Sequence, residues 1–173
     1  MKMSWNDYYR RRDVMDAVLH EAGRDPAGPL PFTEVPGAAE TFGTETGLLL
    51  ALHYRWQLLL EGRLRAEIRD VDEARDDGMH VDAVSRAWRA VAAEHATLRA
   101  VLDAGLNRHV PELLPVHQAE QRMLALTAGL ATLGEPADEV TRIGAAFVAL
   151  LRHRPAPRRN PVGQLLRRLT PSM

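Results

Sequence analysis

The sequence predicts an all-α protein of about six helices arranged around one long central helix. Aromatic residues make up only 5% of the chain, and few β-branched runs are present from which a sheet could form. Every apolar stripe repeats at steps of three and four residues, which is the period of an α-helix rather than of a strand. With 173 residues, 46% of them hydrophobic, the chain is long enough to bury one core.

The central helix is expected from Glu45 to Arg69, because its apolar residues recur on one face at helical spacing. That face consists of Leu49, Leu52, Trp56, Leu59, Leu60, Leu64 and Ile68. Apolar residues also occupy the other sides of the first half, so we expect neighbouring helices to cover this half all round. These additional residues are Leu48, Leu50, Ala51, Tyr54 and Leu58.

Four further helices follow from the same reasoning. The first helix is expected to end at about Gly23, and another to run from Val81 to about Gly105 with a break near His95. Proline is tolerated in the first turn of a helix, so a helix is expected to start near Pro115 and to continue to Leu133, where Gly134 ends it. The last helix is expected from Pro136 to Arg154.

Composition divides the chain into three parts. Residues 1–44 are expected to form a reduced N-terminal helical head, in which a helix precedes a segment rich in proline and glycine. Residues 45–154 are expected to form the helical core and dimerisation domain. Residues 155–173 form a basic tail, because no acidic residue occurs after Arg152.

Two groups of arginines could face nucleic acid or another anionic partner, although the formal net charge of the chain is only -1. The alternative interpretation is that such runs are solvated surface. The candidate nucleic-acid-binding residues are Arg10, Arg11 and Arg12 in the first helix and Arg158, Arg159, Arg167 and Arg168 in the tail.

Several classes of function are not expected. The chain has no cysteine, so it has no disulfide, thiol nucleophile or cysteine metal site. It shows no signal peptide and no apolar run long enough to span a membrane, so we expect a cytoplasmic protein without a membrane partner. A serine elbow, a phosphate-binding loop and a dinucleotide-binding glycine pattern are also missing, so we expect neither an enzyme nor a cofactor.

Histidines and glutamates inside a helical bundle raise the possibility of a metal site. His53, His95, His117, Glu94 and Glu120 would be its candidate ligands. Carboxylate-bridged sites in bundles use Glu-x-x-His pairs, whereas this chain has only the reverse order, His117 followed by Glu120. On spacing alone, no metal ligand is assigned, and His95 is interpreted as a hydrogen-bonded histidine in the apolar seam.

The segment FGTETGLLLAL, from Phe42 to Leu52, resembles TetR-type transcriptional regulators at the point where the recognition helix ends and a leucine-rich helix begins. RRDVMDAVLHEAG resembles the first helix of that family, and AWRAVAAEHATLRAVLDAG, from Ala87 to Gly105, resembles a stretch of its C-terminal domain. The resemblance implies a TetR-like helical bundle, a homodimer and a role in transcription regulation.

The region before Phe42 departs from the family pattern. TetR-type regulators place a helix-turn-helix there, with basic and hydroxyl residues that reach the DNA. In this chain the space is short and contains four prolines, and the would-be reading segment VPGAAET, Val35 to Thr41, carries no basic residue. We therefore expect the helix-turn-helix to be degenerate and DNA binding to be weak or absent.

Two hypotheses remain, and the fold of the segment from Gly23 to Phe42 separates them. In the first, the protein is a TetR-like regulator that encloses a small apolar ligand. The candidate lining residues are Leu52, Trp56, Trp88, Val91, His95 and Met123. In the second, it is a helical interaction protein, an adaptor that uses its basic tail. A folded helix-turn-helix favours the first hypothesis, and a loop packed on the helices favours the second.

The sequence also predicts how a homodimer would form. The two terminal helices, Pro115–Leu133 and Pro136–Arg154, carry strong apolar stripes. Pairing them with the same helices of a second copy would give an intermolecular four-helix bundle.

Overall fold

The computed structural model describes residues 5–74 and 80–153. Within these residues the chain forms seven helices and no strand, which confirms the predicted all-α class. None of the described helices is long and apolar enough to cross a membrane. The helices are α1 Trp5–Ala22, α2 Ala38–Phe42, α3 Glu45–Ala74, α4 His80–Glu94, α5 Ala96–Arg108, α6 Val110–Thr127 and α7 Ala137–Arg152.

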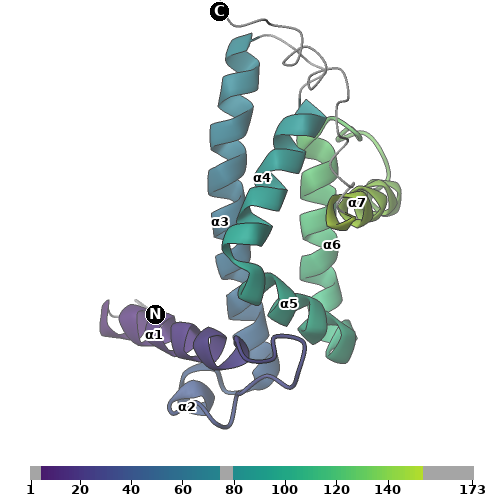
Figure 1. Ribbon diagram of the computed structural model, residues 1–173. Helices are drawn as coiled ribbons and strands as arrows, with labels where there is room; N and C mark the ends of the chain where they lie inside the picture. The colour runs from purple at the N-terminus through teal and green to yellow at the C-terminus, as the bar shows by residue number, and fades with distance from the viewer. Residues whose placement is uncertain (1–4, 75–79, 154–173) are drawn as a thin grey trace, which may run out of the picture.

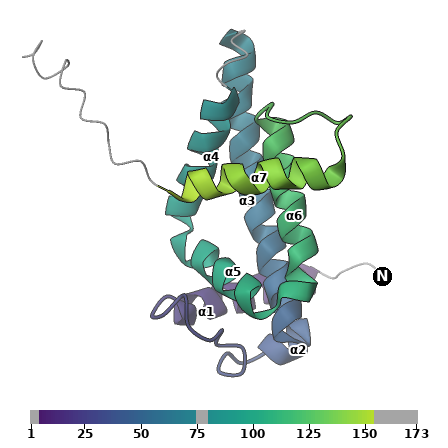
Figure 2. The ribbon, with the colours of Figure 1, turned by 90° about the vertical axis from the view of Figure 1, so that its right-hand side faces the viewer.

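The long helix α3 is the centre of the fold, as predicted, and it packs against α4, α5 and α6. Helices α3, α4 and α6 run along the long axis of the molecule, α1 and α2 lie at one end, and α7 crosses over α4 and α6 (Figures 1 and 2). The face of α3 turned toward its neighbours is buried almost completely. Its buried residues include Leu48, Leu49, Leu52, Trp56, Leu60 and Leu64.

One face of α3 remains open, so the prediction that its first half is covered all round is wrong. Leu50, Tyr54 and Leu58 are 37%, 63% and 52% exposed. These three residues follow one another at steps of four and therefore form a stripe along the helix. The neighbouring helices bury the opposite face of α3. Helix α1 crosses α3 only near one end, so it leaves this stripe open (Figure 1).

A break at His95 separates α4 from α5, in agreement with the sequence prediction. His95 has φ of -123° and ψ of 45°, which are not helical values, and it forms the N-cap of α5. Its N–H still donates to the carbonyl of Val91 at 2.9 Å, and its own carbonyl accepts from the N–H of Arg99 at 3.0 Å. The backbone hydrogen bonds are thus retained across the break while α5 turns toward α1.

Helix α6 begins and ends earlier than predicted. It starts at Val110, because Pro111 lies in the first turn, where a missing N–H is harmless, and Pro115 is accommodated inside the helix. It ends at Thr127, and Gly129 adopts a positive φ of 69° just beyond. There the N–H of Leu130 donates to the carbonyl of Ala125 at 2.9 Å, so this glycine, and not Gly134, stops the helix.

The apolar stripe of α7 packs within the chain. Val140, Phe147 and Leu151 are buried, whereas Leu150 is 68% exposed. The helix crosses α6 at a steep angle instead of running alongside it (Figure 2). The two backbones approach closely at Gly144, where a Cβ would lie 2.0 Å from the carbonyl oxygen of Gln121. The predicted dimer is not tested by this arrangement, but much of the stripe that motivated it is used inside one chain.

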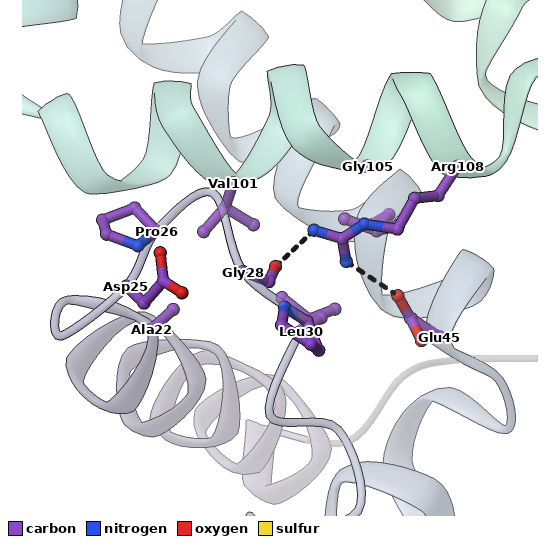
Figure 3. A pocket seen from close by; sticks show the side chains of 11 residues that line it. Ala22, Asp25, Pro26, Gly28, Leu30, Glu45, Val101, Gly105 and Arg108 are labelled. Atoms are coloured by element: carbon purple, nitrogen blue, oxygen red, sulfur yellow. Dashed lines mark hydrogen bonds and ion pairs between the residues drawn. The ribbon is translucent and has the colours of Figure 1, made fainter.

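Residues 23–37 form turns, and the only helix between α1 and α3 is the five-residue α2. The segment is anchored to α5, since Arg108 donates hydrogen bonds to the carbonyls of Ala27, at 3.0 Å, and Gly28, and lies 3.9 Å from Glu45 (Figure 3). Leu30 and Val35 are buried in the same hydrophobic cluster as α1 and α3. Within the described residues, the segment 5–44 therefore shares the core of the helical body.

Two glycines provide a direct test of the packing of α6 and α7. Gly144→Ala should destabilise the protein by about 1–3 kcal/mol, because the added methyl group forces the two backbones apart. Gly62→Ala is the matched control, since Gly62 lies in α3 and a Cβ there meets nothing within 4 Å. It should stabilise the protein by up to about 1 kcal/mol, through helix propensity. Urea unfolding measures both, and equal midpoints for the two variants would contradict the close crossing.

Candidate functional site

A group of buried polar side chains lies where α3, α5 and α6 meet. Among the described residues, the polar or charged side chains that are buried are His53, Arg99, Glu120 and Gln121. Trp56 and the half-buried His117 adjoin them. We refer to His53, Trp56, Arg99, His117 and Glu120 together as the Glu120 cluster. Buried charges are costly unless they are paired, so such a concentration calls for a physical explanation.

Helical spacing brings the members of the cluster together. His53 and Trp56 are three residues apart and share one face of α3, and His117 and Glu120 do the same on α6. Arg99 comes from the first turn of α5, directly after the break at His95. The break therefore aims the arginine at the junction of the other two helices.

The two oxygens of Glu120 have different surroundings. Oε1 accepts hydrogen bonds from Trp56 Nε1 at 3.0 Å and from Arg99 Nη1 at 3.3 Å. Oε2 lies 3.4 Å from His53 Nε2, but the two atoms are not aligned as a hydrogen bond. Within the described part of the chain, neither of these two buried atoms has a hydrogen-bond partner. Oε1 of Glu120 is thus held by two hydrogen bonds, whereas Oε2 faces the His53 imidazole without a hydrogen bond.

Arg99 links Glu120 to the surface of the protein. Its Nε and Nη2 both donate to Asp103 Oδ1, at 3.2 and 2.6 Å, and Arg152 Nη2 donates to the same oxygen at 2.7 Å. The guanidinium also lies over the ring of Trp56, 4.9 Å from its centroid. Two carboxylates and two arginines therefore alternate from the core outward, and this alternation reduces the cost of burying Glu120.

The cluster keeps Glu120 ionised. Burial alone would raise the pKa of this carboxyl group, but the His53 contact, the Arg99 charge and the Trp56 hydrogen bond outweigh burial and lower the pKa to about 2. Burial lowers the pKa of His117, and the charges of Arg99 and Arg152 act in the same direction against the opposing effect of Glu120. Its imidazole is therefore held in the neutral form at physiological pH.

These groups also include a set of candidate metal ligands. One ligand atom each from His53, His117 and Glu120 lies within 4.8 Å of the others. Two of the five residues considered from the sequence, His95 and Glu94, are not part of this group. Spacing within one helix does not reveal this group, because His53 comes from α3 while His117 and Glu120 come from α6.

The residues predicted to line a ligand pocket lie in different parts of the fold. Leu52, Trp56, Trp88 and Val91 lie in the packed core, where the rings of Trp56 and Trp88 meet edge to face at 6.2 Å between centroids. His95 is half-buried at the break before α5. Met123 lines a separate open groove together with Leu64 and Ile68 of α3. A small apolar ligand for these residues stays a prediction.

The arginines proposed for nucleic-acid binding have different positions. Arg10 is exposed, and Arg12 pairs with the neighbouring Asp13 at 3.4 Å. Arg11 donates to the carbonyl of Thr41 at 3.3 Å and lies 4.7 Å above the ring of Phe42, so it holds α2 against α1. The tail arginines 158, 159, 167 and 168 lie outside the described residues.

A second feature of interest is an open groove between α1 and α3. It has a volume of about 520 Å³ and is lined by Tyr8, Arg11, Arg12, Met15, Ala51, Tyr54, Arg55, Leu58 and Leu59. Tyr8 also contacts the exposed rings of Trp5 and Tyr9, with ring centroids 6.5 and 5.6 Å apart. We call the groove together with Trp5 and Tyr9 the aromatic face.

No protein-family model, curated protein or solved structure matches this chain. The resemblance to TetR-type regulators therefore stays a prediction, and function has to be argued from the Glu120 cluster and the aromatic face.

The low pKa of Glu120 predicts a specific dependence of stability on pH. The folded pKa of about 2 is below the unfolded value of about 4.3, so the stabilisation is complete above pH 5 and is lost as the pH falls toward 2. At neutral pH this contribution should be roughly 3 kcal/mol. The difference in unfolding free energy between wild type and Glu120→Gln should therefore shrink by most of that amount between pH 7 and pH 2.5, as measured by urea unfolding at several pH values.

Glu34→Gln is the control for this experiment, because Glu34 is an exposed glutamate in the turn segment. Its pH profile should follow that of the wild type. A constant difference between wild type and Glu120→Gln from pH 7 to 2.5 would show that Glu120 is not held ionised by its neighbours.

Proposed function

We propose that this protein is a helical interaction protein that uses the aromatic face of α1 and α3 to bind a partner. The observation that carries the proposal is the concentration of exposed apolar side chains on these two helices. Six of the ten large hydrophobic residues exposed in the described chain belong to them. They are Trp5, Tyr8, Tyr9, Leu50, Tyr54 and Leu58.

The composition of the face supports a protein interface. Interface centres are enriched in Tyr, Trp, Met and Arg, and residues that dominate binding energy are most often Trp, Tyr and Arg. The aromatic face has all four residue types, including Met15 and Arg55. Scattered single apolar residues are normal on a surface, but a contiguous patch rimmed by charged groups is typical of a binding site.

The fold of the N-terminal region supports this hypothesis over that of a DNA-reading regulator. Residues 23–37 form turns packed on α5, and α2 is only five residues long. This is the arrangement that favours an interaction protein. Sequence-selective DNA binding would need a recognition helix with side chains that reach the bases.

A second copy of this chain is the partner that best fits the face. The groove is lined by arginines and no carboxylate, but Arg55 pairs with Asp16 at 2.5 Å and Arg12 pairs with Asp13, two acids that do not line the groove. In a two-fold dimer the groove arginines of one copy can face these carboxylates of the other, so α1 and α3 together offer charges of both signs to a second copy. With a formal net charge of -1, the two copies would repel each other little.

Light scattering coupled to size exclusion should therefore give a dimer at micromolar concentrations. The double variant Tyr54→Ser and Leu58→Ser should raise the dissociation constant roughly 100- to 1,000-fold, because each substitution removes apolar contact area twice in a symmetric interface. Both residues are more than half exposed, so the melting temperature of the monomer should change little.

Two control variants locate the interface. Leu133→Ser alters a leucine that is 92% exposed outside the face, and it should leave the dimer unchanged. Leu150→Ser alters the exposed side of α7 and should also have no effect. A wild-type monomer at every concentration would overturn the proposal, and so would a dimer that Leu150→Ser dissociates while the Tyr54 and Leu58 variant does not.

A further inference from the structure

We propose that His53, His117 and Glu120 form a binding site for a divalent transition-metal ion of the Zn²⁺ class. Two imidazoles and one carboxylate are a ligand set that zinc uses in proteins, with a fourth position left for water or another ligand. Their ligand atoms come from two helices and lie within 4.8 Å of one another. This site is independent of the aromatic face, which lies on the other side of α3.

The two unpartnered atoms give the first reason for this assignment. His53 Nε2 and Glu120 Oε2 lie 3.4 Å apart, and neither forms a hydrogen bond within the described residues, although both side chains are more than nine-tenths buried. A buried polar atom without a partner is costly, and a bound cation would satisfy both atoms at once.

The surroundings of Glu120 give the second reason. Metal-binding carboxylates are oriented by hydrogen bonds from side chains behind them. Here Trp56 and Arg99 both donate to Oε1, which leaves Oε2 free on the side of His53. Arg99 makes its shorter contacts with Asp103, so its charge is compensated without using the second oxygen of Glu120.

The position of His117 completes the site. It is the least buried of the three ligands, and it lies one turn before Glu120 on α6. A tetrahedral zinc ion with ligands at about 2.0–2.1 Å holds the ligand atoms about 3.3 Å apart, so a bound ion would draw the three side chains inward. The movement of the half-buried His117 would replace the contact at 3.0 Å between its Nε2 and the amide nitrogen of Gln121.

The competing explanation is that a protonated His53 simply pairs with Glu120 and no metal binds. Titration of the full-length chain, without a polyhistidine tag and after treatment with EDTA, separates the two. Isothermal titration calorimetry with Zn²⁺ should show one equivalent bound, and Co²⁺ should give visible absorption bands of a low-coordinate site. Mg²⁺ and Ca²⁺, which prefer sites made of oxygen ligands, should not bind.

Substitutions identify the ligands. His117→Ala and His53→Ala should each weaken Zn²⁺ binding by more than the roughly 10- to 100-fold typical for loss of an outer-shell partner. Trp56→Phe keeps an aromatic side chain but removes the donor to Oε1, so its effect should fall within that smaller range. His20→Ala, which alters an exposed histidine of α1, should have no effect.

Thermal unfolding provides a second measurement in case a variant folds poorly. Zn²⁺ should raise the melting temperature of the wild type and of His20→Ala, but not that of a folded His117→Ala, because only a folded site binds the ion. The proposal is overturned if the folded wild type binds neither Zn²⁺ nor Co²⁺, or if His53→Ala and His117→Ala bind Zn²⁺ as tightly as the wild type.

Discussion

The structure depends on how one buried carboxylate, Glu120, is compensated. An ionised carboxylate inside a protein is tolerated only when donors and opposite charges surround it. Trp56 and Arg99 supply the donors to one oxygen, and His53 faces the other. These partners come from α3 and α5, while Glu120 itself belongs to α6. The three helices therefore have to meet at this point for the charge to be satisfied.

This constraint explains other features of the fold. The break at His95 separates α4 from α5 and places Arg99 at the junction with α3 and α6. In a helix that continued straight from α4, Arg99 would point elsewhere. Arg152 of α7 shares Asp103 with Arg99, so the crossing helix is also connected to the network. The side of α3 that points away from the junction takes no part in the network, and there Tyr54 and Leu58 remain exposed. The Glu120 cluster and the aromatic face thus occupy opposite sides of the same helix.

Local patterns in the sequence predicted the positions of the helices better than the contacts between helices. The helical period located every main helix, and the break at His95 was predicted as well. Both predicted limits of α6, a start near Pro115 and an end before Gly134, were wrong. The helix starts earlier because its first turn tolerates Pro111, and it ends earlier because Gly129 adopts the positive φ. The cluster was missed for a different reason. Arg99 and Glu120 are 21 residues apart, and their pairing depends on the direction of α5, which periodicity does not encode. The signal for the cluster in the sequence was Arg99, a charged residue directly after Leu98 of an apolar stripe.

The ionisation state of Glu120 is the central claim, and carbon NMR of its side-chain carboxyl group tests it most directly. The chemical shift of this carboxyl carbon can be followed as the pH is lowered while the protein stays folded. At pH 3, a carboxyl group with the ordinary glutamate pKa of about 4.3 would be largely protonated, whereas Glu120, with a pKa of about 2, should still be ionised. A midpoint at or above the ordinary glutamate value of about 4.3 would contradict the account, because burial would then outweigh the three partners.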